Sequence, residues 1–438
     1  MKPRNLIIAS VILAALAGAV FWAAKHPKTG TEASTTPPAP KLADIPEAQV
    51  RQVDIAKKGA PPLVLQRTNG NWTITAPEQY PADQSAVTAL LSTLSPLNAD
   101  SVVEDNPPDA GKYGLDAPLL TATIHEKNGK TDQVSIGNDV PAGSLVYARF
   151  GSGKTVYALS NSVKTSFDKS VNDLRDKRLL TFDSAKLTRV ELVSSKGDIE
   201  FGKNGSAEWQ MIKPQPYRAD NLEVEELVRK LGDAKMDLSA SADDQKKTDA
   251  AFLNGQTVAT VKVTDAAGTQ TLQVHKNKDD YYARSGAVKG DYKIASDLGQ
   301  ALAKSVDDFR NKKIFDFGFS DPSRINVQQP GSDKTYTLSG TDWKLNGQTM
   351  DPGAVQSMID KLRDLTASKF VTVGFATPAA TVAITAKKTE KVEFSRNADG
   401  YIARRENEPT LYQLDAKSVD AILEAGKSIK PAAPSKKK

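Results

Sequence analysis

The residue types that most often do chemistry are scarce in this sequence. Its 438 residues contain no cysteine and only three histidines. Without cysteine the chain has no disulfide, no thiolate metal site and no cysteine nucleophile. No serine lies in a Gly-x-Ser-x-Gly elbow, and no two carboxylates stand out as an acid and base couple. We therefore expect no enzymatic activity, no catalytic residues, no cofactor and no metal ligands.

Two patterns resemble functional motifs but lack the spacing that defines them. The run Gly151–Thr155 ends like a phosphate-binding loop, yet the glycine required five positions before Gly153 is replaced by Ala148. We interpret this run as the tip of a hairpin. His125 and His275 lie on predicted strands with no second ligand at a metal-binding spacing, so a metal site there is not expected.

The most regular polar feature is an arginine that follows an alanine in three similar segments. These residues are Arg149, Arg284 and Arg404. Guanidinium groups bind carboxylates and phosphates through paired hydrogen bonds, so the three arginines form a candidate surface for an anionic partner or a glycan. The alternative is that each one pairs with a nearby carboxylate or lays its aliphatic stem across a sheet.

The elements around these arginines recur along the chain. Three tryptophans, Trp72, Trp209 and Trp343, are separated by 137 and 134 residues. Each is followed by an aspartate suited to cap a helix, and apolar residues then recur at offsets 4, 7, 8 and 11. The three apolar stripes are Val87, Leu90, Leu91 and Leu94; Val224, Leu227, Val228 and Leu231; and Val355, Met358, Ile359 and Leu362. The spacing predicts one amphipathic helix in each copy.

Alternating apolar segments with Asn-Gly turns between them predict strands joined as hairpins. A second helix follows, and in the third copy it shrinks to a brief stretch around Val419 and Leu423. We therefore predict an α+β fold: an N-terminal transmembrane helix, then three tandem repeats of a mainly antiparallel sheet with two helices each, the last repeat shortened. The predicted segments are residues 1–28 (membrane anchor), 29–48 (Pro/Thr/Ala-rich linker), 49–184 (repeat 1), 185–320 (repeat 2), 321–429 (truncated repeat 3) and 430–438 (basic tail).

The N-terminal segment Leu6–Ala24 consists of apolar or small residues throughout. A helix of that length nearly spans a hydrocarbon core of about 30 Å. Lys2 and Arg4 favour an N-terminus in the cytoplasm, so we expect a single pass through the bacterial inner membrane and a periplasmic body. The alternative is a cleavable signal peptide cut at Ala15-Leu16-Ala17, which would also export the body.

The net charge of +5 comes from the two ends of the chain. Nine of the 58 basic residues flank the N-terminal apolar segment or lie in the C-terminal tail. The other 49 face 53 acidic residues, so residues 29–426 carry a charge of about −4. Nucleic-acid binding requires clustered Lys and Arg that neutralise phosphates. We therefore expect no nucleic acid among the partners.

The clearest motifs lie in the first copy. They are Trp72, Pro77, Asp83, the run Tyr113–Pro118, Tyr147–Arg149 and Asp173–Lys177. At these residues the chain resembles the uncharacterised DUF4340-type repeat domain family, which is associated with gliding-motility-type ABC transport auxiliary systems. The resemblance covers about residues 50–425 and implies a membrane anchor followed by repeats outside the membrane. The family has no established catalytic residues, so the resemblance assigns none to this chain.

Together these observations favour a non-enzymatic, membrane-anchored envelope protein that contacts the inner membrane through Leu6–Ala24. The resemblance implies an accessory or scaffold role in an ABC-type transport complex, with protein partners in the envelope. The alternative is a periplasmic module that binds glycan or peptidoglycan through Arg149, Arg284 and Arg404. A periplasmic hydrolase is the third hypothesis, and the scarcity of His and Cys counts against it.

Overall fold

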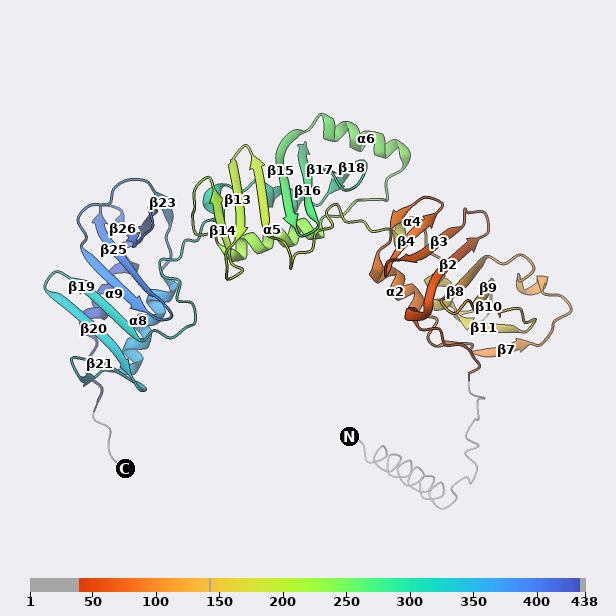
Figure 1. Ribbon diagram of the computed structural model, residues 1–438, viewed down its shortest axis with the longest axis horizontal. Coiled ribbons are helices and arrows are strands. Elements are labelled where there is room, and N and C mark those ends of the chain that lie inside the picture. The colour runs from red at the N-terminus through yellow and green to blue at the C-terminus, as the bar shows by residue number, and fades with distance from the viewer. Residues whose placement is uncertain (1–38, 142, 434–438) are drawn as a thin grey trace, which may run out of the picture. The chain divides into compact units, whose positions relative to one another are not determined.

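The computed structural model describes residues 39–141 and 143–433 (Figure 1). The described residues form two compact units. Unit 1 ends at Asp176, and unit 2 begins at Lys177. The predicted membrane segment Leu6–Ala24 lies outside the described residues. Among the helices of the two described ranges, none is long and apolar enough to cross a membrane.

Unit 1 consists of antiparallel strands and short helices. Its strands are β1 (Lys41–Ala43), β2 (Val50–Lys57), β3 (Leu63–Thr68), β4 (Asn71–Ala76), β5 (Tyr80–Pro81), β6 (Leu97–Asn98), β7 (Ser101–Glu104), β8 (Leu120–Glu126), β9 (Thr131–Asp139), β10 (Leu145–Phe150) and β11 (Val156–Ser160). Its helices are α2 (Gln84–Ser92), α3 (Asn161–Phe167) and α4 (Val171–Leu174), with 3-10 turns η1 (Glu47–Gln49) and η2 (Gly111–Tyr113). Nine strands form one sheet in the order β5-β4-β3-β2-β8-β9-β10-β11-β7, and β1 pairs separately with β6.

Unit 2 contains two large antiparallel sheets. The strands of the first are β12 (Arg189–Ser194), β13 (Gly197–Lys203), β14 (Trp209–Lys213), β15 (Gln256–Asp265), β16 (Gly268–Asn277), β17 (Asp280–Ser285) and β18 (Asp291–Ile294), in the order β14-β13-β12-β15-β16-β17-β18. Its helices are α5 (Asn221–Asp233), α6 (Ala242–Leu253) and α7 (Ser296–Leu302), with the 3-10 turn η3 (Val306–Phe309).

The second sheet of unit 2 has nine strands. They are β19 (Arg324–Gln329), β20 (Ser332–Ser339), β21 (Asp342–Leu345), β22 (Gln348–Thr349), β23 (Lys369–Val371), β24 (Ala380–Thr385), β25 (Thr389–Asn397), β26 (Gly400–Arg405) and β27 (Leu411–Leu414). Their order is β22-β21-β20-β19-β24-β25-β26-β27-β23, and the helices are α8 (Pro352–Asp364) and α9 (Ala416–Ser428).

The predicted helix starts and hairpins are confirmed locally. Asp83, Asp220 and Asp351 cap α2, α5 and α8, and each carboxylate accepts a hydrogen bond from backbone N–H groups of the first turn. The β3–β4 turn consists of Asn69 and Gly70, both with positive φ (51° and 88°), as a two-residue type I′ hairpin requires. These features depend on a few neighbouring residues, which is why local spacing predicts them.

Each large sheet has its own hydrophobic core, and a tryptophan lies in each. The exposed fractions of Trp72, Trp209 and Trp343 are 2%, 4% and 7%. The predicted apolar helix stripes are buried in the same three clusters. The tryptophans therefore stabilise the cores and are not available as stacking platforms for a ligand.

The predicted fold class, a transmembrane helix followed by three tandem repeats with the last one shortened, is wrong. The described residues form four antiparallel sheets in two compact units, and the second and third large sheets belong to the same unit. The last large sheet has nine strands against seven in the sheet before it, and α9 is a full helix of 13 residues around Val419 and Leu423. Local spacing shows that helices and hairpins recur, but the grouping of sheets depends on contacts between residues far apart in sequence.

Candidate functional site: recurring arginines and a buried polar network

The three recurring arginines occupy one place in the three large sheets. Arg149 lies on β10, Arg284 on β17 and Arg404 on β26. Their partners across the preceding strand are Ser135, Gln273 and Glu393. The sheets thus hold the three guanidiniums in the same register but beside different neighbours, so their environments have to be compared one by one.

Arg284 is committed to a buried carboxylate. Its Nε and Nη2 lie 2.7 Å from Oδ1 and 2.7 Å from Oδ2 of Asp291, which is 3% exposed. The guanidinium also lies over the ring of Phe252, 4.4 Å from its centroid. The hydrogen bonds that Arg284 donates to Asp291 raise the pKa of Arg284 above its ordinary value. This bidentate pair leaves the guanidinium little capacity to bind a partner.

Arg404 is paired in a similar way and lines a hollow of about 430 Å³. Its Nη2 lies 2.6 Å from Oε2 of Glu393, and its guanidinium lies 4.3 Å from the ring centroid of Phe375. The lining residues are Lys391, Glu393, Arg404, Arg405, Glu406, Asn407, Glu408 and Pro409. The three cations of that lining each pair with one of its three carboxylates, so the hollow presents no excess charge to a ligand.

Arg149 differs from the other two. Its Nε is buried and has no hydrogen-bond acceptor among the described residues. Tyr147, two residues earlier on the same face of β10, contacts the ring of Tyr113 from the Tyr-Gly-Leu-Asp-Ala-Pro run at a centroid distance of 4.8 Å. Of the three arginines, Arg149 is therefore the one whose guanidinium is not taken up by a carboxylate in the described part of the chain.

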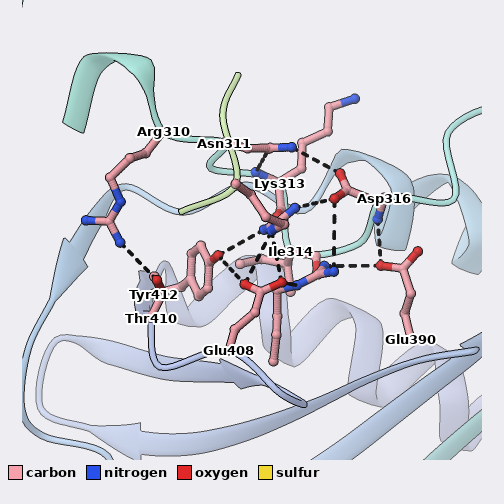
Figure 2. A network of polar contacts seen from close by, with 11 residues as sticks. Arg310, Asn311, Lys313, Ile314, Asp316, Glu390, Glu408, Thr410 and Tyr412 are labelled. Carbon is pink, nitrogen blue, oxygen red and sulfur yellow. Dashed lines mark hydrogen bonds and ion pairs between the residues drawn. The ribbon is translucent and has the colours of Figure 1, made fainter. Parts of the chain in front are cut away.

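A second set of polar contacts in unit 2 surrounds Arg218 and Arg405. Figure 2 shows this network. It links the segment before α5, the connection between η3 and β19, and strands β25 to β27. We refer to these residues as the polar network; they are Arg218, Arg310, Asn311, Lys313, Ile314, Asp316, Glu390, Arg405, Glu408, Thr410 and Tyr412.

Arg218 contacts three side chains of the polar network. It forms an ion pair with Asp316, lies 3.1 Å from Oε1 of Glu408 and donates to the hydroxyl of Tyr412 at 3.0 Å. Burial disfavours the charge on Arg218, but the carboxylates of Asp316 and Glu408 outweigh this effect and raise the pKa of Arg218. Burial also raises the pKa of Tyr412, whose hydroxyl donates to Glu408 at 2.9 Å. Arg218 therefore stays charged and tied to the last sheet.

Arg405 forms the most buried ion pair of the network. Its side chain is 8% exposed and that of Glu390 is 5% exposed, with Nη1 and Oε2 3.1 Å apart. The Nε of Arg405 lies 2.7 Å from Glu408, and Nη1 also donates to the carbonyl of Ile314. The same oxygen of Glu390 accepts the backbone N–H of Asp316 at 2.8 Å. These contacts fasten residues 314–316 to β25 and β26.

Arg310 joins two sheets through stacking. Its guanidinium carbon lies 3.9 Å from the ring centroid of Tyr217 and 3.6 Å from that of Phe370. Its Nη1 pairs with Asp307 at 2.8 Å, and its Nη2 donates to Thr410 at 3.1 Å (Figure 2). Arg310 contacts all four of these side chains. Its guanidinium is therefore better suited to fix one segment against another than to bind a substrate.

Sequence reasoning did not identify the polar network. Two signals pointed toward it: Phe309–Lys312 repeats the pattern of Leu174–Lys177, and Tyr217–Asp220 repeats Tyr80–Asp83 with an arginine at the second position. In both units these segments meet, since the N–H of Asp83 donates to Leu174 and that of Asp220 to Phe309, each at 2.8 Å. The repeated patterns thus mark two places where the residue that caps a helix contacts a segment much later in the sequence.

The weaker candidates have structural roles. Gly151–Thr155 is the loop between β10 and β11, and Gly151 has a positive φ of 62°, as a hairpin tip allows. His125 pairs with Asp54 at 2.9 Å, and His275 stacks on Phe252 at a centroid distance of 4.1 Å. Within residues 39–141 and 143–433, no three His, Asp or Glu side chains come together in a way that could hold a metal ion.

Comparisons with known proteins agree with the motifs in part. The family described as "Domain of unknown function (DUF4340)" matches residues 72–206 and 209–383, so the chain carries two tandem copies of this domain. No curated protein matches the sequence. A solved structure of a DNA polymerase sliding clamp from Pseudomonas aeruginosa with ligand is similar over 85% of this chain and 93% of that chain. Its identity of 7% and TM-score of 0.17 are too low to support an argument. By the extent of the family match, which covers more than half of its residues, the chain belongs to the DUF4340 family of domains of unknown function.

Proposed function

We propose that this chain is a non-enzymatic interaction protein of the bacterial envelope, an accessory or scaffold component of an ABC-type transport complex. The observation that carries the proposal is the commitment of its charged clusters to internal contacts. Arg284 and Arg404 hold carboxylates, and the polar network joins parts of unit 2 to one another. What remains for partners is the exposed surface of the sheets and helices.

Exposed apolar side chains on these surfaces support the proposal. Val193 on β12 is 48% exposed, Ile212 on β14 is 47% exposed and Leu222 on α5 is 78% exposed. Burial of apolar side chains is a main driving force of protein–protein association, so these residues offer apolar area for a partner to cover. The experiment is recovery of the full chain with its neighbours from mildly solubilised membranes, where we expect a transport permease or ATPase to be enriched.

A second candidate function rests on Arg149. Because its guanidinium has no carboxylate partner among the described residues, it could meet the carboxylates of peptidoglycan stem peptides on the outer face of β10. We expect Arg149→Ala to weaken binding of the chain to purified sacculi about tenfold, since a hydrogen bond to a charged group contributes about 1.5–3 kcal/mol. Arg404→Ala, which removes an arginine already paired with Glu393, is the matched control and should leave sacculus binding unchanged. Equal binding by wild type and both variants would contradict this candidate.

A further inference from the structure

A hollow of about 720 Å³ lies at one end of the large sheet of unit 1. Its lining residues are Glu47, Ala48, Arg51, Arg67, Gly70 and Lys127. Because β2 runs antiparallel to both β3 and β8, the start of β2 lies beside the ends of β3 and β8. Three cations from separate strands and turns are thereby brought around one space.

The fold holds the guanidinium groups of Arg67 and Arg51 and the backbone of Lys127 in place. Arg67 donates to the carbonyl of Gly70 at 3.1 Å and pairs with Glu47 at 3.2 Å, and its guanidinium lies 5.4 Å from the centroid of the Trp72 ring. Arg51 donates through Nε to the carbonyl of Glu126 at 3.2 Å. The backbone N–H of Lys127 donates to the carbonyl of Gln49 at 2.8 Å.

Two of the three positive charges are left uncompensated. Arg51 uses only Nε in the contact above, and in the described part of unit 1 neither its Nη atoms nor the ammonium of Lys127 has a carboxylate partner. The nearby acids are occupied: Glu47 pairs with Arg67 and accepts from Trp72, and Glu126, 4% exposed, lies 3.5 Å from Lys130.

The excess of positive charge is local to the hollow, because unit 1 as a whole is acidic. Residues 39–176 contain 13 basic and 16 acidic residues. Like charges held together in a unit of opposite net charge cost energy unless an anion joins them. A phosphate group offers several acceptor oxygens to donors from different directions, and Arg and Lys are its usual partners. The volume lies within the usual range for ligand sites, about 300–1,000 Å³.

We propose that this hollow binds a phosphate-bearing ligand, with Arg51 and Lys127 contacting the phosphate oxygens beside the Arg67–Glu47 ion pair. The phosphate could belong to a soluble molecule or to the headgroup of an anionic phospholipid. Neither the family match nor the proposed scaffold role assigns this site. It stands independently of both.

The experiment uses the full chain at constant ionic strength, because surface charge interactions are screened by salt. Pyrophosphate is titrated by calorimetry, and vesicles of phosphatidylglycerol or phosphatidylcholine are tested by sedimentation. The test variant is Arg51→Gln/Lys127→Gln, which changes two exposed side chains. The control is Lys154→Gln/Lys58→Gln, which removes the same charge from exposed positions of unit 1 that do not line the hollow.

We expect the test variant to weaken binding at least tenfold, which is about 1.4 kcal/mol. We expect the control variant to weaken it less than twofold. Pyrophosphate binding with no preference between vesicles would identify a soluble ligand. A preference for phosphatidylglycerol that the test variant loses would identify a lipid headgroup. The proposal would be overturned if the chain neither binds pyrophosphate nor prefers phosphatidylglycerol vesicles. It would also be overturned if the test and control variants weaken binding equally.

Discussion

Replacing Arg405 by alanine is expected to lower the free energy of unfolding of unit 2 by about 3–5 kcal/mol. The substitution leaves Glu390, whose side chain is 5% exposed, without its ion-pair partner and removes the donor to the carbonyl of Ile314. A buried carboxylate without a partner must take up a proton or be hydrated, and both cost stability. The loss can be measured by urea-dependent hydrogen exchange in peptides from β25 and β26.

The neighbouring residue provides the control for this prediction. Arg404 pairs with Glu393, but its side chain is 48% exposed, so Arg404→Ala should cost less than about 1 kcal/mol. Adding Glu390→Gln to Arg405→Ala should recover part of the loss, because the unpaired charge is then removed. Similar losses for Arg404→Ala and Arg405→Ala would show that the polar network does not hold unit 2 together.

Replacing Trp72 by alanine should lower the stability of unit 1 by about 3–5 kcal/mol. The side chain is 2% exposed, packs in the core of the large sheet and donates through Nε1 to Glu47 at 3.4 Å. Hydrogen exchange in β2 and β8 is the measurement. Trp72→Phe keeps most of the volume and should cost about 1.5 kcal/mol or less. An alanine cost as small as the phenylalanine cost would mean that Trp72 is not a core residue.

Features set by neighbouring residues could be predicted from the sequence. The caps at Asp83 and Asp220, the buried stripes of α2 and α5 and the Asn69-Gly70 turn each depend on a span of about a dozen residues or fewer. Such spans carry their own signal, because helix periodicity and turn chemistry are local properties.

The partners of polar groups could not be predicted in the same way. Arg218 and Glu408 are 190 residues apart in sequence, and nothing near either residue indicates the other. The recurrence of Arg149, Arg284 and Arg404 suggested one shared surface, but the neighbours of each arginine differ, so two are paired with carboxylates and one is not. Sequence position identified the place in the sheet, and the tertiary contacts determined what each guanidinium can bind.

The polar network also connects the two sheets of unit 2. Arg310 stacks between Tyr217 and Phe370, which belong to the two different halves of the unit. Arg218 and Arg405 add ion pairs along the same connection. These contacts hold the connecting residues 310–316 against the last sheet.

We propose that this chain acts by holding other envelope proteins and makes or breaks no bonds itself. The direct measurement is cross-linking in intact cells, followed by purification of the tagged full chain from mildly solubilised membranes and identification of what is attached. We expect a permease or ATPase of an ABC-type transporter to be enriched over an untagged strain and to be retained with Arg404→Ala. Recovery of the chain with no inner-membrane protein enriched over that strain would contradict it.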